Sequence, residues 1–148
     1  MPTMFTVPWR WTRTARPAQT VVFVSRFDAR GARARLALLG AGIRLRGAVL
    51  AAPGALGVSL RAHPFGGRYY TLSMWEDEEA LLAFAHGPDH RVAVKRIAAL
   101  GPVSGVLISR EDGSTRPRWR EVLRWADGVE PGPYRMASAT SEPGTVRS

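Results

Sequence analysis

Residues Tyr69–Ile97 read YYTLSMWEDEEALLAFAHGPDHRVAVKRI and decide the fold. Residues Arg68–Trp75 include three aromatic residues and alternate between two faces, which predicts a strand. Asp77 is a natural N-cap for a short helix. Gly87 and Pro88 break that helix, and proline suits the first position of the next one. The stretch therefore predicts a strand followed by two short helices.

The second of these helices carries a histidine on its apolar side. His90, Ala93, Val94 and Ile97 fall at i, i+3, i+4 and i+7, the spacing of one helix face. We expect this face to pack on the sheet. His90 and Trp75 then lie near opposite walls of one small domain, which indicates a pocket.

Outside this stretch the chain alternates between strand and helix patterns. Further strands are predicted at Thr20–Phe27, Ala55–Ala62 and Val103–Arg110. A helix is predicted over Ala32–Ala52. The helix residues expected to be buried are Leu36, Leu39, Ile43 and Leu50. In the strand Ala55–Ala62, the residues expected to share one face are Leu56, Val58, Leu60 and Ala62.

The order of elements is βαββαβ, which predicts a ferredoxin-like α+β domain with a four-stranded antiparallel sheet. Several strands are apolar on both sides, so we expect a second copy to cover the other face, forming a homodimeric α+β barrel. Residues 1–19 are expected to form an arm, and residues 20–126 the domain with a short C-terminal helix. Residues 127–148 are expected to be disordered.

The composition narrows the classes of function. The 148 residues suit one domain, and the absence of cysteine excludes disulfides and thiolate chemistry. The net charge is +9, but the arginines are scattered, so we predict a generally basic surface and no nucleic-acid partner. The chain has no membrane-length apolar run and no signal peptide, so we expect a cytoplasmic protein. No flavin or nicotinamide motif is found, since the glycines of Ala52–Gly57 lead into a strand.

Three stretches share a pattern with known proteins: APGALGVSL (Ala52–Leu60), YYTLSMWEDEEALLAFA (Tyr69–Ala85) and PDHR (Pro88–Arg91). Together they resemble the dimeric α+β-barrel superfamily of antibiotic-biosynthesis monooxygenases. Within it the likeness is greatest to spheroidene-monooxygenase-like and related uncharacterised bacterial proteins, which share the Trp-Glu-Asp helix start and a Pro-x-His-Arg step. The likeness spans Thr20–Arg110.

The resemblance implies a monooxygenase-like oxidoreductase that acts on a bulky aromatic or polyene-like molecule in an apolar pocket between sheet and helices. The superfamily includes cofactor-free and haem-dependent oxygenases, so the cofactor is either none or haem. Haem-degrading members use an asparagine on the first strand, and this chain contains no asparagine. Three alternatives stay open: a non-catalytic haem or small-molecule binding module, a cyclase or isomerase of the same fold, and a structural dimer.

His90 is the candidate catalytic residue, as a general base or as an axial ligand of haem iron. Its alternative is a core histidine bonded to backbone, Ser73 or Thr71. No free metal-ion site is predicted, because the three histidines lack ligand spacing. The candidate substrate-binding residues are Trp75, Phe84, Tyr69, Tyr70 and Arg91, each with packing or a solvated surface position as the alternative.

Overall fold

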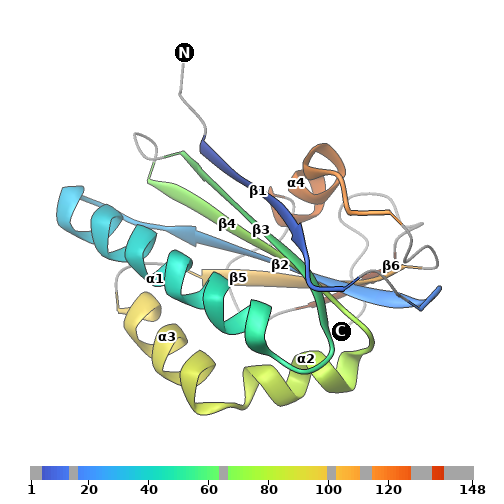
Figure 1. Ribbon diagram of the computed structural model, residues 1–148. Coiled ribbons are helices and arrows are strands. Elements are labelled where there is room, and N and C mark those ends of the chain that lie inside the picture. The colour runs from blue at the N-terminus through green and yellow to red at the C-terminus, as the bar shows by residue number, and fades with distance from the viewer. Residues whose placement is uncertain are drawn as a thin grey trace.

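The computed structural model describes residues 5–13, 17–63, 67–99, 103–110, 115–127 and 135–138. Figure 1 shows the arrangement of the elements. The strands are β1 (Phe5–Trp11), β2 (Thr20–Asp28), β3 (Ala55–His63), β4 (Arg68–Trp75), β5 (Val103–Arg110) and β6 (Arg135–Ser138). The helices are α1 (Ala32–Ala51), α2 (Glu78–Ala85), α3 (Pro88–Ala98) and α4 (Trp119–Asp127).

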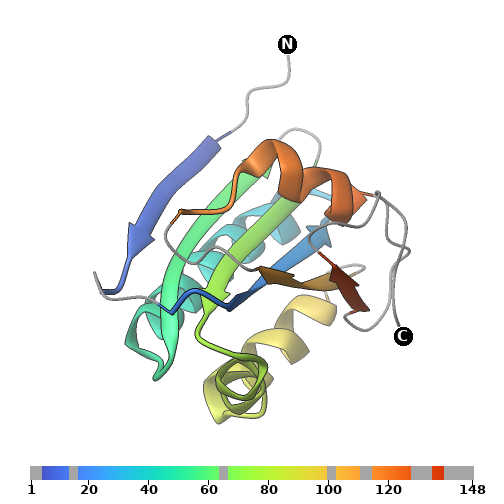
Figure 2. The same cartoon turned by 90° about the vertical axis from the view of Figure 1, so that its right-hand side faces the viewer.

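The strands form one sheet in the order β1-β3-β4-β2-β5-β6. Its central strands, β3-β4-β2-β5, are antiparallel and have the ferredoxin-like order, which confirms the predicted fold class. At one edge β1 pairs antiparallel with β3, and at the other β6 pairs parallel with β5. Both outer edges of the four-stranded core are therefore paired within the chain, as Figure 2 shows.

The helices divide between the two faces of the sheet. Figures 1 and 2 show α1, α2 and α3 on one face and α4 on the other. Under α1–α3 lies a core that includes Val58, Trp75 and Leu81. Under α4 lies a second core of Val22, Val24, Leu56, Tyr70, Leu72, Met74 and Val122, against which Trp9, Trp11 and Trp119 pack. Both faces are thus apolar, as the strand pattern predicted.

The predicted buried stripe of α1 was wrong at three of its four positions, whereas Leu50 packs against the core under α1–α3 as predicted. Leu36, Leu39 and Ile43 are 71%, 45% and 57% exposed, whereas Leu38 and Val49 are buried. The last two are eleven residues apart, close to three whole turns, so they share a face. Gly42 lies near the same face, because a Cβ there would be 3.9 Å from Leu60. A glycine gives no apolar signal, so the sequence pattern indicated a face rotated from the true one.

A bulge corrects the predicted face of Leu56. The register of β3 on β4 shifts between Ala55 and Gly57, and Leu56 joins the core under α4. Val58 instead packs with Trp75 on the opposite face. One extra residue in a strand reverses the alternation, which strict period-two counting misses.

The two ends of the chain are more regular than expected. Within the predicted arm, residues 5–11 form β1, and within the predicted disordered tail, residues 135–138 form β6. Both strands pair with open edges of the sheet, whose backbone groups bond almost any sequence. The predicted C-terminal helix is present as α4. Residues 1–4 and 139–148 lie outside the described residues.

Candidate functional site

A row of three aromatic rings runs from the sheet to α3. The ring centroids of Trp75 and Phe84 are 5.1 Å apart, and those of Phe84 and His90 are 5.2 Å apart. Trp75 is fully buried, and its indole nitrogen donates to Ser73 Oγ at 2.9 Å. The Phe84 ring therefore packs between the buried Trp75 indole and the His90 imidazole.

The backbone fixes the tautomer of His90. Its Nδ1 lies 3.1 Å from the carbonyl oxygen of Ala85, which can only accept a hydrogen bond, so Nδ1 carries the hydrogen. The lone pair is then on Nε2. Burial lowers the pKa of His90 below 6.5, and the bond to Ala85 opposes this shift. At neutral pH His90 is therefore an uncharged imidazole with its lone pair on Nε2, which can accept a proton or ligate a metal.

His90 lines a hollow between α1, α2 and α3, which we call the His90 hollow. Its volume is about 440 Å³, within the range of ligand pockets. Phe84 lines it beside the histidine, and most of the remaining wall is alanine and proline, including Ala48, Ala51 and Pro53 of the α1 end. This wall is mostly apolar, so it suits an apolar molecule better than a polar one.

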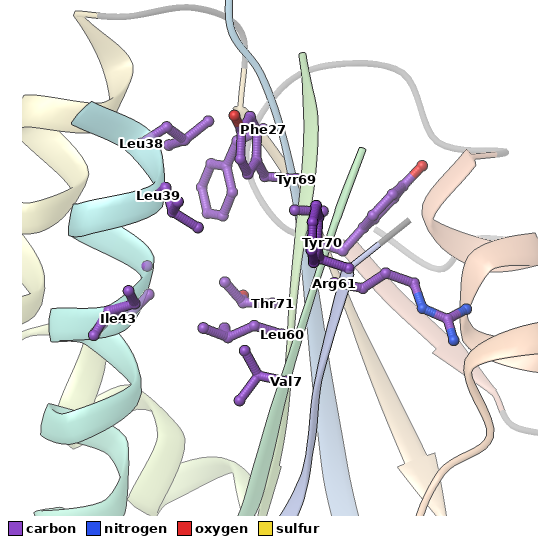
Figure 3. Close-up of a pocket in the computed structure, with 14 residues that line it drawn as sticks. Val7, Phe27, Leu38, Leu39, Ile43, Leu60, Arg61, Tyr69, Tyr70 and Thr71 are labelled. Atoms are coloured by element: carbon purple, nitrogen blue, oxygen red, sulfur yellow. The ribbon is translucent and has the colours of Figure 1, made fainter. Parts of the chain in front are cut away.

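A second cavity lies between α1 and the sheet, and we call it the Tyr69 cavity. It measures about 80 Å³, and Figure 3 shows Phe27, Leu38 and Leu60 around it. The Tyr69 hydroxyl donates to the Arg35 carbonyl oxygen at 3.1 Å, and burial raises the Tyr69 pKa. Since liquid water occupies about 30 Å³ per molecule, this cavity admits only a small group.

The structure separates the predicted site residues into three places. His90, Phe84 and Trp75 come together. Tyr69 lies elsewhere: its cavity touches α1 around Gly42 and the His90 hollow touches α1 around Ala51, about 13 Å away at 1.5 Å per residue.

The other two candidates, Tyr70 and Arg91, do not line the His90 hollow. Tyr70 points to the opposite face of the sheet, where its ring centroid is 6.4 Å from that of Trp119 (Figure 3). Arg91 is exposed on α3. The sequence argument had already placed the two tyrosines on opposite faces, and that placement is confirmed.

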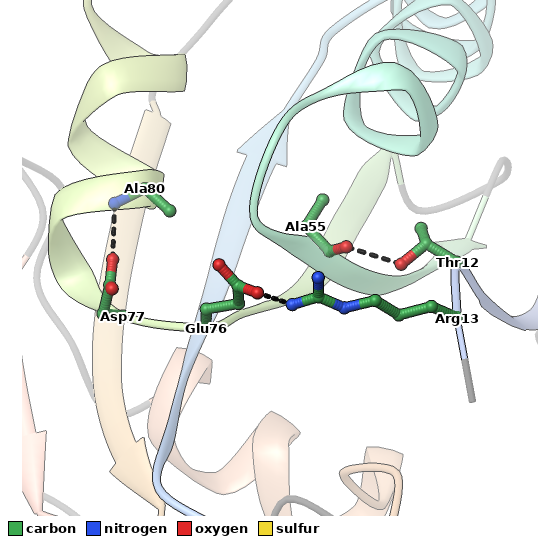
Figure 4. Close-up of polar contacts among 6 residues, drawn as sticks. All are labelled: Thr12, Arg13, Ala55, Glu76, Asp77 and Ala80. Carbon is green, nitrogen blue, oxygen red and sulfur yellow. Dashed lines mark hydrogen bonds and ion pairs between the residues drawn. The ribbon is translucent and has the colours of Figure 1, made fainter. Parts of the chain in front are cut away.

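Polar contacts hold the junction between β4 and α2, where the row of rings begins. Asp77 caps α2 by accepting the Ala80 amide hydrogen at 2.8 Å. Glu76 forms an ion pair with Arg13, and Thr12 donates to the Ala55 carbonyl (Figure 4). Of the partners considered for His90, the backbone is the one observed, whereas Ser73 accepts a hydrogen bond from Trp75. Because the partner is a backbone carbonyl, no pattern of side chains could have revealed the His90 tautomer.

The model of the family described as antibiotic biosynthesis monooxygenase matches residues 20–96. The chain belongs to this family. The match runs from β2 into α3 and so contains Trp75, Phe84 and His90. It leaves out β1 and α4, which cover the other face of the sheet.

Solved structures share the fold of this monooxygenase family member. One is a mutant form of SnoaB, a cofactor-independent oxygenase from Streptomyces nogalater, with 21% identity and a TM-score of 0.53 over 68% of this chain and 96% of that one. Another is Rv0793 from Mycobacterium tuberculosis, with 20% identity and a TM-score of 0.59 over 65% and 99%. None of the curated proteins matches the chain. No helix in the described part of the chain is long and apolar enough to span a membrane.

Proposed function

We propose that the protein is a monooxygenase-type oxidoreductase that acts on a bulky aromatic or polyene-like molecule bound in the His90 hollow. The observation that carries the proposal is the half-buried His90, whose Nδ1 is fixed by the Ala85 carbonyl oxygen and whose lone pair is therefore on Nε2. Membership of a monooxygenase family supports the reaction class. The cofactor-independent SnoaB supports a version without a redox cofactor.

In that version the substrate supplies its own electrons. A ring methylene activated by a neighbouring phenol loses two hydrogens and gains one oxygen atom to become a carbonyl. Oxygen takes four electrons, and its second atom leaves as water. His90 Nε2 takes the first proton and produces the conjugated anion that reduces O₂. The apolar wall excludes water and orients the anion.

The rings around His90 have distinct proposed roles. Phe84 contacts the flat substrate because it lines the hollow, and Trp75 acts beneath it as a positioning residue. Arg91, exposed one residue beyond His90, would meet an acidic group at the hollow's edge. Tyr69 and Tyr70 would take part only if a substrate reached beyond the hollow, so we rank them below Phe84.

A haem-binding role is the second candidate, favoured by the same bond. Metal-ligating histidines usually donate their other ring hydrogen to a carbonyl or carboxylate, as Nδ1 of His90 does. Bound haem would supply oxygen activation, and Nε2 of His90 would hold its iron. The Pro88–Arg91 step also leads us to place the chain near the spheroidene-monooxygenase-like group.

The test measures oxygen uptake with a panel of anthrones and naphthols, corrected for uptake without protein. A general base contributes about 10²–10⁴-fold, so His90→Gln should lower kcat/KM at least 100-fold. His86→Gln is the matched control, because His86 is an exposed histidine at the end of α2. It should leave kcat/KM within twofold of the wild type.

Three outcomes would redirect the proposal. Equal uptake by His90→Gln and wild type would remove His90 as the base. Product formation without oxygen uptake would indicate a cyclase or isomerase. A stoichiometric Soret band with hemin that is lost in His90→Gln and kept in His86→Gln would establish the haem-binding candidate. The homodimer stays a prediction, which sedimentation velocity measures directly.

A further inference from the structure

A third hollow lies on the opposite face of the sheet from His90. It is bounded by β1, β3 and the segment 115–119 that leads into α4, and its volume is about 550 Å³. We call it the Arg61 hollow. Its walls include the indoles of Trp9 and Trp119 and three arginines, Arg61, Arg116 and Arg118. The proposed reaction at His90 does not use this region.

Arg61 is held in place on two sides. Its Nε donates to Thr6 Oγ1 at 3.0 Å, and its guanidinium carbon lies 5.0 Å from the centroid of a Trp119 ring. Trp119 is itself fixed, because its indole nitrogen donates to Ser59 Oγ at 3.1 Å. The anchoring uses Nε and one face of the guanidinium. The two terminal nitrogens remain to bind a ligand.

The charged residues that line the hollow around this guanidinium are all positive. None of the ten described residues that line the hollow is an aspartate or a glutamate. Arg61 forms no ion pair among the described residues, whereas Arg13 and Arg26 each pair with a carboxylate. Arg116 and Arg118 add two exposed positive charges at the rim. An anion that entered would therefore meet three cations and no opposing charge.

We propose that the Arg61 hollow binds a flat aromatic carboxylate. A carboxylate pairs with the two terminal nitrogens of a guanidinium in a bidentate geometry. An aromatic body next to that carboxylate would meet the indole rings of Trp9 and Trp119. The volume admits a molecule of two or three fused rings. The hollow binds its ligand independently of any reaction at His90.

The experiment titrates the full-length protein with 2-naphthoate and follows tryptophan fluorescence and heat. Arg61→Gln should raise the Kd at least tenfold, since a hydrogen bond to a charged group contributes about 1.5–3 kcal/mol. Arg61→Lys should recover only part of the affinity, because an ammonium keeps the charge but loses the planar fork. Arg118→Gln, at an exposed position, should weaken binding about two- to fivefold, and thermal unfolding should show an intact fold.

Matched controls separate this site from the His90 hollow and from general charge. Arg33→Gln removes an exposed arginine on α1 and should leave the Kd unchanged, as should His90→Gln. 2-Naphthamide, which keeps the rings without the charge, should bind at least tenfold more weakly than 2-naphthoate. The proposal is overturned by the absence of saturable 2-naphthoate binding, by equal Kd values for wild type, Arg61→Gln and Arg118→Gln, or by equal binding of the amide. Sulfate competing as strongly as 2-naphthoate would overturn the aromatic part. Loss of 2-naphthoate binding in His90→Gln would show that the ligand binds in the His90 hollow and not in the Arg61 hollow.

Discussion

Gly57 is a position at which a single methyl group should destabilise the fold by collision with one identified side chain. A Cβ there would overlap Cζ2 of Trp9 and lie 2.6 Å from its Cε2, where ordinary contact needs at least 3.4 Å. The indole is rigid, and it packs edge to face on Trp11 with ring centroids 5.2 Å apart. Gly57→Ala must therefore push Trp9 off the sheet and loosen β1.

The expected cost follows from overpacking. Such substitutions destabilise by about 1–3 kcal/mol, which for a chain of this length lowers the Tm by roughly 3–12 °C. Circular dichroism measures the Tm, and urea titration the free energy of unfolding. Gly40→Ala is the matched control, since nothing lies within 4 Å of a Cβ at this exposed position on α1. Because alanine favours a helix over glycine by up to about 1 kcal/mol, Gly40→Ala should raise the Tm.

A double-mutant cycle tests the stated cause. In a Trp9→Ala background the obstructing ring is gone, so Gly57→Ala should cost less than about 0.5 kcal/mol. Additive losses from the two substitutions would show that the damage does not arise from their contact. An unchanged Tm in Gly57→Ala alone would refute the packing of Trp9 on β3.

Two further predictions concern the aromatic row. Because burial lowers the pKa of His90 in the folded state, the unfolded chain takes up this proton first, so the free energy of unfolding should fall as the pH drops from about 6.5 through the lowered pKa. His90→Gln should remove this part of the pH dependence and His86→Gln should keep it, measured by urea titration between pH 5 and 7.5; equal slopes for both variants would contradict the shift. Ser73→Ala removes the acceptor of the buried Trp75 indole nitrogen and should cost about 1–3 kcal/mol. The same change in a Trp75→Phe background should cost much less, and equal costs in both backgrounds would contradict the bond.

The fold was predictable because its signals are local. The alternation of Tyr69–Trp75, the Asp77 cap and the Gly87–Pro88 break each specify an element without help from distant residues. The errors arose at positions where a contact with a residue distant in the sequence decides which face a side chain occupies. Gly42 faces Leu60 although it carries no apolar signal, and a bulge turns Leu56 to the other face.

The candidate site was predictable in part, for a related reason. Helical spacing predicted that the face carrying His90 packs on the sheet, but the His90 ring packs on Phe84 of α2 and lines a hollow between helices. The bond from Nδ1 to the Ala85 carbonyl involves a backbone group, which every residue carries, so no pattern marks it. The alanine wall contributed by α1 also lacks any signal, because it depends on how α1 crosses α2 and α3.

The second face of the sheet changes the argument about partners. Apolar residues on both sides of the strands led us to expect a second copy, yet α4 buries Val122 there and Trp9 and Trp119 pack beside it. Both apolar faces of the sheet are thus covered by elements of the same chain, so apolar residues on both faces do not by themselves require a dimer. These covering elements lie outside the residues that match the family model. The Arg61 hollow on this face takes Trp9 and the segment 115–119 from outside the matched residues, and Ser59 and Arg61 from within them. The proposed reaction at His90 would therefore lie on the face covered by α1–α3, and the proposed anion site on the face covered by α4.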